Sequence, residues 1–232
     1  MKINDKTCNN DQVDNTNAFE VVIARYNENL SWIESNFPCD KVTVYNKGLD
    51  NLNLPSNCQV IKLPNIGRES HTYLHHIIEN YNNLANRTLF LQGDPFDHKS
   101  FIYNPLSKYK TINTGHICKN IIAVCVYDNL YKMSNSLLNI KWNQTKWHDI
   151  NISNETLLDF NKKIFGTKNI SNDGKIGVVF GAQFAMDKEK ITCNSISYHQ
   201  EIYEIFNNQH PIEVHYIERL WDWWGECHNL YN

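Results

Sequence analysis

The stretch that decides the fold covers residues 63–98 and reads LPNIGRESHTYLHHIIENYNNLANRTLFLQGDPFDH. Its apolar residues recur at helical spacing from Tyr73 to Tyr81, which predicts a helix over residues 68–84 with one buried face. The run TLFLQ then predicts a buried strand over residues 88–92. A helix followed closely by an apolar strand is typical of an α/β fold.

Upstream of this stretch, short apolar runs alternate with polar turns. The runs FEVVIARY, KVTVYNKG and QVIKLPN predict strands over residues 19–26, 41–48 and 59–65. Between the first two, NENLSWIESN predicts an amphipathic helix over residues 27–36. Strand, helix and strand in this order predict an α/β fold whose mixed, mainly parallel sheet is flanked by helices.

The second half of the chain has a weaker pattern. The run NIIAVCVYD predicts a strand over residues 120–128, and strand character returns around Gly181 within residues 176–191. Two helices, over residues 195–209 and 215–226, are expected to close the fold. The Asn- and Trp-rich region through Trp142 and Trp147 predicts loops and short elements.

Composition limits the class of protein. The chain has 232 residues, of which 41% are hydrophobic and 20% charged, enough for one substantial core. We expect a flexible arm over residues 1–18, which lack apolar periodicity, and a single domain over residues 19–232. The formal net charge of -3 argues against a nucleic-acid-binding protein, because phosphate contacts demand a basic face.

Cysteine usage and hydropathy predict the compartment. The cysteines are widely spaced and include no Cys-x-x-Cys pair, which favours reduced thiols over a disulfide framework. No apolar run reaches the roughly 18 to 20 residues of a membrane span, and the first residues are polar rather than signal-like. We therefore expect a cytoplasmic protein without a transmembrane segment. The cysteines are Cys8, Cys39, Cys58, Cys118, Cys125, Cys193 and Cys227.

Charged residues follow the predicted strands and open the predicted helix. Gly67, Arg68 and Glu69 place a flexible turn, a cation and an acid at the helix start, where free N–H groups and the helix dipole attract anions. Arg25 and Lys47 follow the first two strands and are interpreted as contacts to the diphosphate or base of a nucleotide. Each cation taken alone is more often an ordinary surface residue.

The fold predicts that these residues meet. Loops after parallel strands open onto one edge of the sheet, so Arg25, Glu28 and Lys47 are expected to gather there with the turn of residues 67–69 and the turn of residues 94–98. A core sheet does not need charged groups at every carboxyl end. The pattern therefore favours a ligand site at this edge.

The turn after residues 88–92 carries three candidate metal ligands. Asp94, Asp97 and His98 combine hard and borderline ligands within one turn, which predicts binding of Mn²⁺ or Mg²⁺ together with substrate phosphates. The alternative is that residues 93–95 form only a turn, in which Asp94 caps a following helix.

Paired histidines indicate a second possible chemistry. His71 and His75 lie four residues apart on one helical face, the spacing at which helices present imidazoles to zinc. The Glu of a His-Glu-x-x-His motif and a clear third ligand are missing, so packing or hydrogen bonding, shared with His76, is the favoured interpretation. A metal-dependent hydrolase that uses His71, His75, Asp94 and His98 is kept as an alternative.

The C-terminal half supplies candidates for an acceptor site. Glu218 lies among tryptophans, where burial would raise its pKa and suit a general base, although an exposed charge is an equal alternative. Trp221 suits stacking on a sugar ring, while core packing is the commoner use of such a residue. Gln183 follows the small residues Gly181 and Ala182 and offers a donor and an acceptor to hydroxyl groups.

Six motifs carry a resemblance to a known family. ARYNE, YNKG, NxGRExxTYLxHI, FLQGDPxxH, GAQF and ERLW occur in this order between Phe19 and Trp224. In this combination the chain resembles an uncharacterised family with the same motifs, and that family is similar to glycosyltransferases of the GT-A fold. The resemblance implies a single GT-A-like, Rossmann-like domain that binds a nucleotide sugar.

The resemblance also implies a role for individual residues. Asp94 takes the place of the metal-binding acid, while Gln183 and Glu218 fall on the acceptor side, with Glu218 as the base of an inverting transfer. One departure is that Gln92-Gly93-Asp94 replaces the usual Asp-x-Asp, so Arg and Lys side chains are an alternative to the cation. The residues implied in donor binding are Ala24 to Glu28, Asn46 to Gly48, Asn65, Gly67, Arg68 and Glu69.

Together these features predict a glycosyltransferase. We expect it to move a sugar from a nucleoside diphosphate donor to a hydroxyl group of a glycan or another acceptor, assisted by Mn²⁺ or Mg²⁺. Glu218 and Asp97 are the candidate catalytic residues. Besides the hydrolase, a non-catalytic glycan-binding module of the same fold is the second alternative.

Overall fold

The computed structural model describes most of the first half of the chain and selected parts of the second. The predicted arm over residues 1–18 lies outside the described residues. So do Asp97, His98 and Gly181. The described residues are 19–54, 57–95, 110–111, 123–124, 131–133, 155–167, 170, 176–178, 182–206 and 213–221.

A five-stranded sheet in the order β3-β2-β1-β4-β9 forms the centre of the protein. Its first four strands are mutually parallel, whereas β9 is antiparallel to β4. The predicted α/β fold with a mixed, mainly parallel sheet is therefore confirmed. The strands are β1 (Glu20–Arg25), β2 (Val42–Asn46), β3 (Gln59–Lys62), β4 (Arg87–Gln92) and β9 (Phe184–Asp187). Two short antiparallel pairs join β5 (Lys110–Thr111) to β6 (Ala123–Val124) and β7 (Tyr131–Met133) to β8 (Ile176–Val178).

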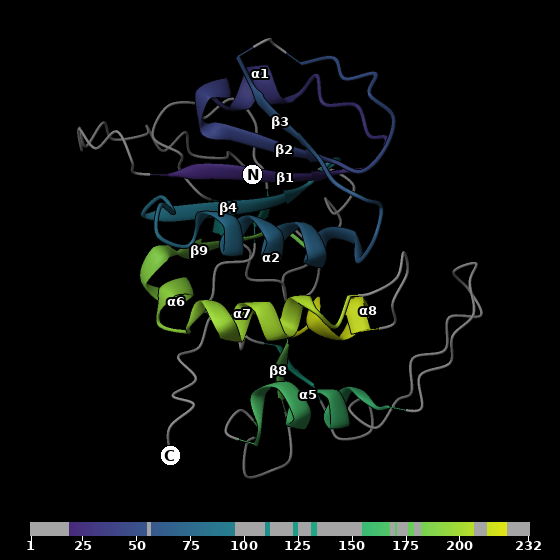
Figure 1. Cartoon of the computed structure of the whole chain (residues 1–232), viewed down its shortest axis with the longest axis vertical. Helices are drawn as coiled ribbons and strands as arrows, with labels where there is room; N and C mark the ends of the chain where they lie inside the picture. Colours follow the sequence, from purple (N-terminus) through teal and green to yellow (C-terminus); the bar gives the residue numbers. More distant parts are fainter. Residues whose placement is uncertain are drawn as a thin grey trace, which may run out of the picture.

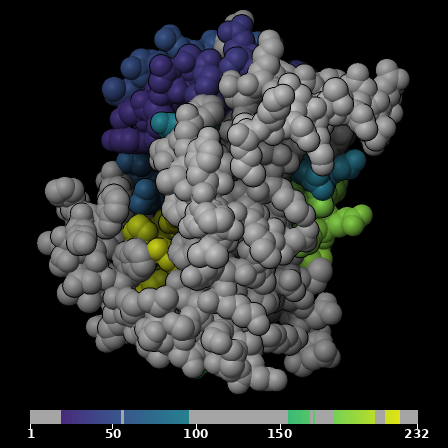
Figure 2. All heavy atoms as spheres, turned by 180° about the vertical axis from the view of Figure 1, so that it is seen from behind, coloured from purple at the N-terminus to yellow at the C-terminus, as the bar shows by residue number. Residues whose placement is uncertain are grey.

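Helices pack around this sheet. Helix α2 runs beside β4, with α7 and α8 beyond it, and α1 lies near β2 and β3 (Figure 1). Seen from behind, the purple residues of the first strands lie at one end of the molecule and the yellow residues of α8 lie below them (Figure 2). The helices are α1 (Ile33–Asn36), the short 3₁₀ turn η1 (Cys39–Lys41), α2 (Arg68–Asn80), α5 (Leu157–Phe165), α6 (Lys188–Thr192), α7 (Ile196–Tyr203) and α8 (Glu213–Ile217).

Alternate strand residues point into two apolar layers. Val22 and Phe90 pack with Tyr73 of α2 in the larger layer, which also includes side chains of α5, α7 and α8. Val21 packs with Ile33 of α1 in the smaller layer on the opposite face. Because both faces of the sheet are covered, its strands read as nearly continuous apolar runs. This burial explains why β1, β2 and β4 could be predicted from the sequence.

Two helices differ from the sequence prediction. Residues 27–36 were expected to be helical throughout, but α1 begins only at Ile33. The preceding residues form a loop in which the Glu28 carbonyl oxygen accepts a hydrogen bond from Arg25 Nε, so this part of the chain serves the end of β1 instead. Helix α5 lies after the Asn- and Trp-rich region, in a segment for which no helix was predicted. Thr156 and Asp159 form a reciprocal capping box at its start.

A disulfide joins Cys39 and Cys58, which precede β2 and β3 respectively. Cys193 is also disulfide-bonded. The expectation of reduced thiols is therefore wrong for these three cysteines. Cys39 and Cys58 are far apart in the sequence but meet because the parallel strands β2 and β3 begin side by side. Among the described residues, no helix is long and apolar enough to cross a membrane.

Candidate functional site

The ends of four strands meet at one edge of the sheet. In the strand register, Ala24 of β1 lies between Tyr45 of β2 and Gln92 of β4. Strand β9 runs the other way, so its first residue, Phe184, pairs with Phe90 near the end of β4. The loops after β1, β2 and β4 and the segment before β9 therefore open onto the same edge. In parallel sheets this carboxyl edge is the usual place of a ligand site.

Helix α2 begins beside this edge with an unusual turn. Gly67 and Arg68 both have left-handed backbones, with φ of 58° and 47°. A side chain at Gly67 would place its Cβ 2.6 Å from His71 Cβ, so only glycine fits there. No side chain caps the helix among the described residues, and the first turn presents free N–H groups and the positive end of the helix dipole. This start suits an anion.

Lys47 binds the backbone of the same turn. Its side chain is 8% exposed, and Nζ donates hydrogen bonds to the carbonyl oxygens of Ile66, at 2.7 Å, and Arg68. Burial lowers the pKa of Lys47 to about 7, and the nearby charge of Glu69 opposes that shift. Lys47 was predicted to contact a nucleotide, but its ammonium group is occupied by the protein backbone.

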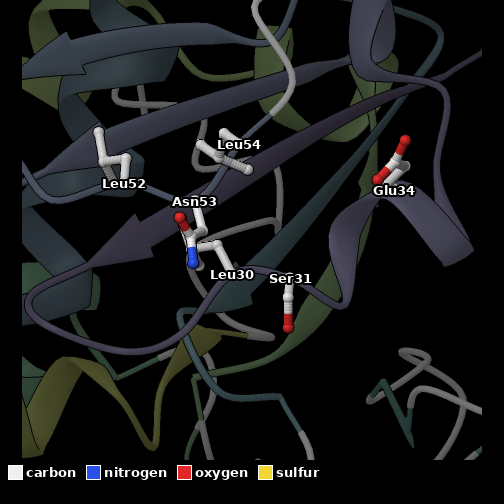
Figure 3. Close-up of a pocket in the computed structure, with 6 residues that line it drawn as sticks. All are labelled: Leu30, Ser31, Glu34, Leu52, Asn53 and Leu54. Carbon is white, nitrogen blue, oxygen red and sulfur yellow. The ribbon is translucent and has the colours of Figure 1, made fainter.

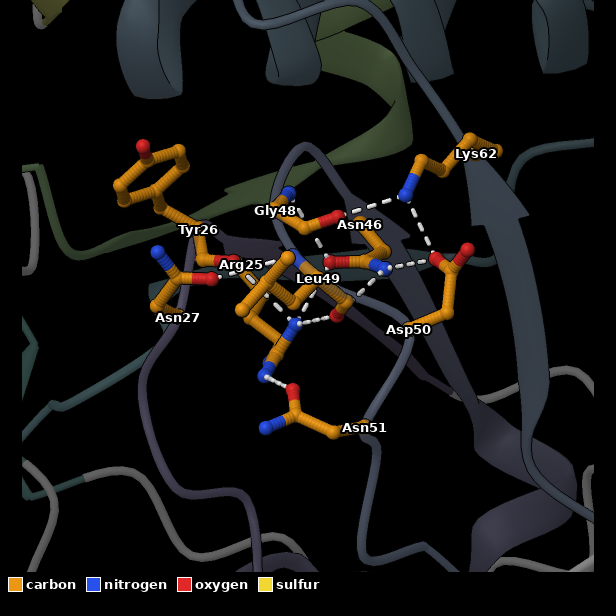
Figure 4. A network of polar contacts seen from close by, with 9 residues as sticks. All are labelled: Arg25, Tyr26, Asn27, Asn46, Gly48, Leu49, Asp50, Asn51 and Lys62. Atoms are coloured by element: carbon orange, nitrogen blue, oxygen red, sulfur yellow. Dashed lines mark hydrogen bonds and ion pairs between the residues drawn. The ribbon is translucent and has the colours of Figure 1, made fainter.

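Arg25 also differs from its predicted role. The side chain is 3% exposed, and its guanidinium lies in the centre of a polar network at the ends of β1 and β2 (Figure 4). It donates to Asn46 Oδ1 and to the Leu49 carbonyl oxygen, both at 2.7 Å. Further bonds reach the carbonyl oxygens of Tyr26 and Glu28 and the side chain of Asn51. Arg25 therefore joins two loops and is not positioned to hold a diphosphate.

A chain of amides links α2 to β4 and β9. Gln92 Nε2 donates to Glu69 Oε1, and Gln183 Nε2 donates to Gln92 Oε1, both at 3.3 Å. Gln183 Nε2 also donates to the Pro95 carbonyl oxygen at 3.1 Å. The other amide atom, Gln183 Oε1, is buried and has no hydrogen-bond partner among the described residues. A buried acceptor of this kind is expected to meet a donor from a ligand or water.

Gln92 was not predicted as a site residue. The available signal was a polar side chain at the end of the otherwise apolar run TLFLQ. The structure shows that Gln92 connects Glu69 to Gln183. Gln183, predicted on the acceptor side, therefore lies near the start of α2, which was predicted to bind the donor. Tyr73 reinforces this link, because its hydroxyl donates to the Ala182 carbonyl oxygen at 2.7 Å.

Glu218 joins the site from the segment after α8. Burial raises its pKa, but the hydrogen bond to His215 and the charges of Arg219, His215 and Arg68 outweigh burial and leave the pKa lowered. The expected raised pKa is therefore wrong, because the neighbouring His215 and Arg219 and the distant Arg68 outweigh the effect of burial. Arg68 Nε lies 3.6 Å from Glu69 Oε2, and the charge of Arg68 contributes to the lowered pKa of Glu218. Glu218 is held as an anion next to the start of α2.

Trp221 does not form an acceptor platform. Its side chain is fully buried, and its ring lies 4.8 Å from that of Phe184 and 5.8 Å from that of Tyr73, measured between centroids. These contacts place Trp221 in the larger apolar layer. The prediction of sugar stacking by this residue is corrected to core packing. The neighbouring Trp223 and Trp224 lie outside the described residues.

Of the three candidate metal ligands in the turn after β4, only Asp94 lies within the described residues, and it is exposed. The backbone before it is fixed, because Trp32 Nε1 donates to the Gly93 carbonyl oxygen at 2.9 Å. A Cβ at Gly93 would come within 2.5 Å of Glu28 Oε2, so this glycine makes room for the Glu28 carboxylate. Within the described ranges, no three His, Cys, Asp or Glu side chains form a group that could hold a metal ion. Asn65 is half-buried just before the turn of α2.

The histidines of α2 have protein partners. His71 Nε2 and the Tyr203 hydroxyl lie 2.7 Å apart, and burial lowers the pKa of His71 to about 3. The His75 ring stacks on that of His71, with centroids 6.3 Å apart. His76 Nδ1 lies 3.0 Å from the Tyr45 hydroxyl. These contacts support the favoured interpretation of packing and hydrogen bonding, and nothing in them favours the zinc hydrolase.

An open hollow of about 450 Å³ lies on the α1 face of the sheet (Figure 3). Buried Leu30 and half-buried Leu52 and Leu54 supply apolar surface, and among the described residues that line the hollow only Glu34 is charged. A hollow without a cation does not suit phosphate. It offers a place for an uncharged part of a substrate, and its lining residues are Leu30, Ser31, Glu34, Leu52, Asn53 and Leu54.

The fold is that of an α/β protein in which polar loops gather at the carboxyl ends of the parallel strands. The family described as "Protein of unknown function (DUF3431)" matches residues 21–229, and the chain belongs to this family. No curated protein and no solved structure matches the chain.

Proposed function

We propose that the protein is a glycosyltransferase that moves a sugar from a nucleoside diphosphate to a hydroxyl group of an acceptor. The observation that supports this proposal is the meeting of three groups at one edge. They are the anion-receptive start of α2 with Arg68, the anionic Glu218, and the acceptor Gln183 Oε1, which has no partner within the part of the chain that the structure describes. Together they provide a place for phosphate, for a proton acceptor and for sugar hydroxyls.

The donor phosphates are assigned to the start of α2. Arg68 is exposed there, and the N–H groups of the first turn add partial positive charge without the cost of moving a side chain. Lys47 contributes its charge from within the protein, whereas Arg25 is removed from the predicted donor contacts. Charge that builds up on the departing diphosphate is then stabilised by groups already in position.

The acceptor side is assigned to Glu218 and Gln183. In a direct displacement, the acceptor oxygen forms a bond to the anomeric carbon while the bond from that carbon to the diphosphate oxygen breaks. The hydroxyl proton passes to Glu218, whose lowered pKa keeps it ionised at neutral pH. Gln183 Oε1 accepts a hydrogen bond from a sugar hydroxyl. This reaction inverts the anomeric centre.

We assign the proposed Mn²⁺ or Mg²⁺ ion to the turn after β4. Asp94 has the carboxylate chemistry that such ions prefer, and Asp97 and His98 are the further candidates outside the described residues. A divalent ion bound there would neutralise the diphosphate charge. The steps assigned to Arg68, Glu218 and Gln183 do not depend on it.

The proposal also covers the substrates and the cellular location. The expected partners are a nucleotide sugar and a glycan or other hydroxyl acceptor, and the hollow beside α1 has room for an uncharged part of either. A cytoplasmic location stays a prediction, and the Cys39–Cys58 disulfide counts against it because such bonds are typical of oxidising compartments.

A donor-consumption assay tests the proposed function. Wild type, Arg68→Ala and Asp94→Ala are compared with UDP-, GDP-, CMP- and dTDP-sugars, with and without Mn²⁺. We expect release of the nucleotide by wild type and a loss of roughly 100-fold or more in Arg68→Ala, the usual size for removal of a charge-stabilising group. Lys163→Ala, which removes an exposed lysine in α5, is the control. Equal activity in Arg68→Ala and the control would refute the assignment.

A further inference from the structure

The buried Lys47 has a role that differs from ligand contact. Resting on the proposed function, we propose that Lys47 is a positioning residue, which holds the turn of residues 66–68 so that the N–H groups at the start of α2 face the donor phosphates. Lys47 itself does not touch the ligand. The proposal rests on where its ammonium group points, on the backbone that it contacts and on the charges around it.

Lys47 contacts two peptide groups of the turn. Nζ of Lys47 binds the carbonyl oxygens of Ile66 and Arg68, one on each side of Gly67. In a trans peptide the N–H group points away from the carbonyl oxygen of the same plane. Carbonyls turned toward Lys47 therefore turn the N–H groups of Gly67 and Glu69 away from it. One buried side chain thus sets the direction of two donors.

The turn also needs such support because its backbone is unfavourable. Arg68 is the only residue other than glycine with positive φ among the described residues. This conformation persists only where the surroundings enforce it, and such residues are concentrated at functional sites. The close approach of Gly67 to His71 and Phe206 blocks the turn on one side, and Lys47 holds its carbonyls on another. The strained turn is fixed before a ligand arrives.

The charge of Lys47 is sensitive to its surroundings. Glu69 stabilises the ammonium form, while His71 and His75 lie close enough for their own pKa values to be lowered by it. Both histidines are neutral around pH 7, because burial lowers their pKa values too. Burial brings the pKa of Lys47 to about 7. Above this pH the amine loses its charge, its bonds to the carbonyls weaken, and the site loses a positive charge.

Calorimetry on the full chain tests the proposal. The ligand is whichever UDP-, GDP- or dTDP-sugar raises the melting temperature most, and affinity is measured between about pH 6 and pH 8.5, where the two phosphodiester-like groups of such a donor keep a fixed charge. We expect wild-type affinity to fall as the pH rises through 7. In Lys47→Met, affinity should be about tenfold weaker at the lower pH, and the pH step should be absent.

Two further variants separate positioning from general stability. Lys47→Gln keeps an uncharged donor and is expected to retain part of the affinity without the pH step. Lys163→Met removes an exposed charge elsewhere and should match wild type in both respects. Binding by Lys47→Met with the wild-type affinity, or with the wild-type pH step, would overturn the proposal.

A measurement without ligand keeps this proposal distinct from the proposed function. Amide ¹⁵N shifts of Gly67 and Glu69 are followed by NMR as the pH is raised. They should titrate near pH 7 in wild type and not in Lys47→Met, which should also show greater backbone motion over residues 66–69. If these changes occur but no nucleotide sugar binds, the transferase proposal fails and the positioning role stands. If the shifts do not titrate, the positioning role fails even where the nucleotide sugar binds.

Discussion

At the residue scale, Arg25 is expected to contribute to stability rather than to ligand binding. Arg25→Met would remove a buried cation together with the five hydrogen bonds that it donates at the ends of β1 and β2. We expect the free energy of unfolding to fall by about 3 kcal/mol, measured by urea denaturation. Lys62→Met, which removes an exposed cation from the same network, should cost less than about 1 kcal/mol.

The opposite result would restore the original interpretation of Arg25. If Arg25→Met is as stable as Lys62→Met but loses affinity for a nucleotide sugar, the guanidinium is a ligand contact. Lys62 is a suitable control because it belongs to the same polar network as Arg25, but Arg25 is buried and Lys62 is exposed.

Trp221 provides a second test at this scale. Trp221→Ala is expected to lower the free energy of unfolding by about 3 to 5 kcal/mol, because it opens a cavity against Phe184 and Tyr73. Trp221→Phe should cost less, since most of the ring is retained. A loss below about 1 kcal/mol in a thermal or urea melt of Trp221→Ala, combined with weaker acceptor binding, would favour the sugar platform.

Residue roles could be predicted only in part. The sequence identified Arg25 and Lys47 as polar groups at strand ends and Glu218 as an acid within an aromatic helix. It could not identify what each group contacts, because burial and pKa depend on loops distant in sequence. The Leu49 carbonyl oxygen accepts a hydrogen bond from Arg25, and the charge of Arg68 lowers the pKa of Glu218. Both pairs are far apart in the sequence, so no local pattern predicts them.

At the element scale, the Cys39–Cys58 disulfide is expected to stabilise the segments that lead into β2 and β3. It closes a loop with a sequence separation of 19 residues. Replacing both cysteines with alanine should lower the free energy of unfolding by about 3 kcal/mol, as the loop-entropy estimate predicts for a loop of this length. Wild type treated with a reducing agent should lose at least this amount, because the disulfide of Cys193 is reduced as well. Free thiols at both positions in the unreduced, denatured protein would contradict the bond.

Strands and the long helix were easier to predict than the short helices. β1, β2 and β4 are buried on both faces, and α2 has a long apolar face, so their patterns are strong. Helix α1 has only four residues, because the preceding loop is used to bind Arg25 and to reach Gly93. Helix α5 carried a readable signal in its capping residues Thr156 and Asp159, although its surroundings suggested loops.

At the scale of the whole molecule, buried neutral histidines predict acid sensitivity. Burial lowers the pKa of His71 to about 3 and that of His199 to about 4, whereas the unfolded chain takes up protons near 6.5. A lowered folded pKa means that the unfolded state binds more protons below pH 6.5. Stability should therefore be fully present above this pH and fall as the pH decreases toward 4 and then 3.

The variant His199→Gln checks this cause. It keeps a donor for the Ile191 carbonyl oxygen and removes one titrating group. Between about pH 6 and pH 4.5, the slope of its unfolding free energy against pH should be smaller than that of wild type by up to 1.4 kcal/mol per pH unit, about one proton. Equal slopes in urea melts across this range would show that His199 is not a source of the acid sensitivity.

The disulfide and the proposed site lie at opposite ends of the parallel strands. The disulfide lies where β2 and β3 begin, whereas the groups assigned to the donor and acceptor lie where the parallel strands end. Sequence patterns predicted this edge because charged residues follow successive apolar strands. They did not predict that Arg25 and Lys47 act within the protein, which leaves Arg68 as the exposed cation assigned to the phosphates.

Titration calorimetry with nucleotide sugars tests the central claim most directly. Wild type and Arg68→Ala are titrated with UDP-, GDP-, CMP- and dTDP-sugars in the presence and absence of Mn²⁺. The account predicts that at least one nucleoside diphosphate sugar binds to wild type and that Arg68→Ala weakens its binding by about tenfold or more. Failure of every donor to bind wild type, or equal affinity in Arg68→Ala, would contradict a phosphate site at the start of α2.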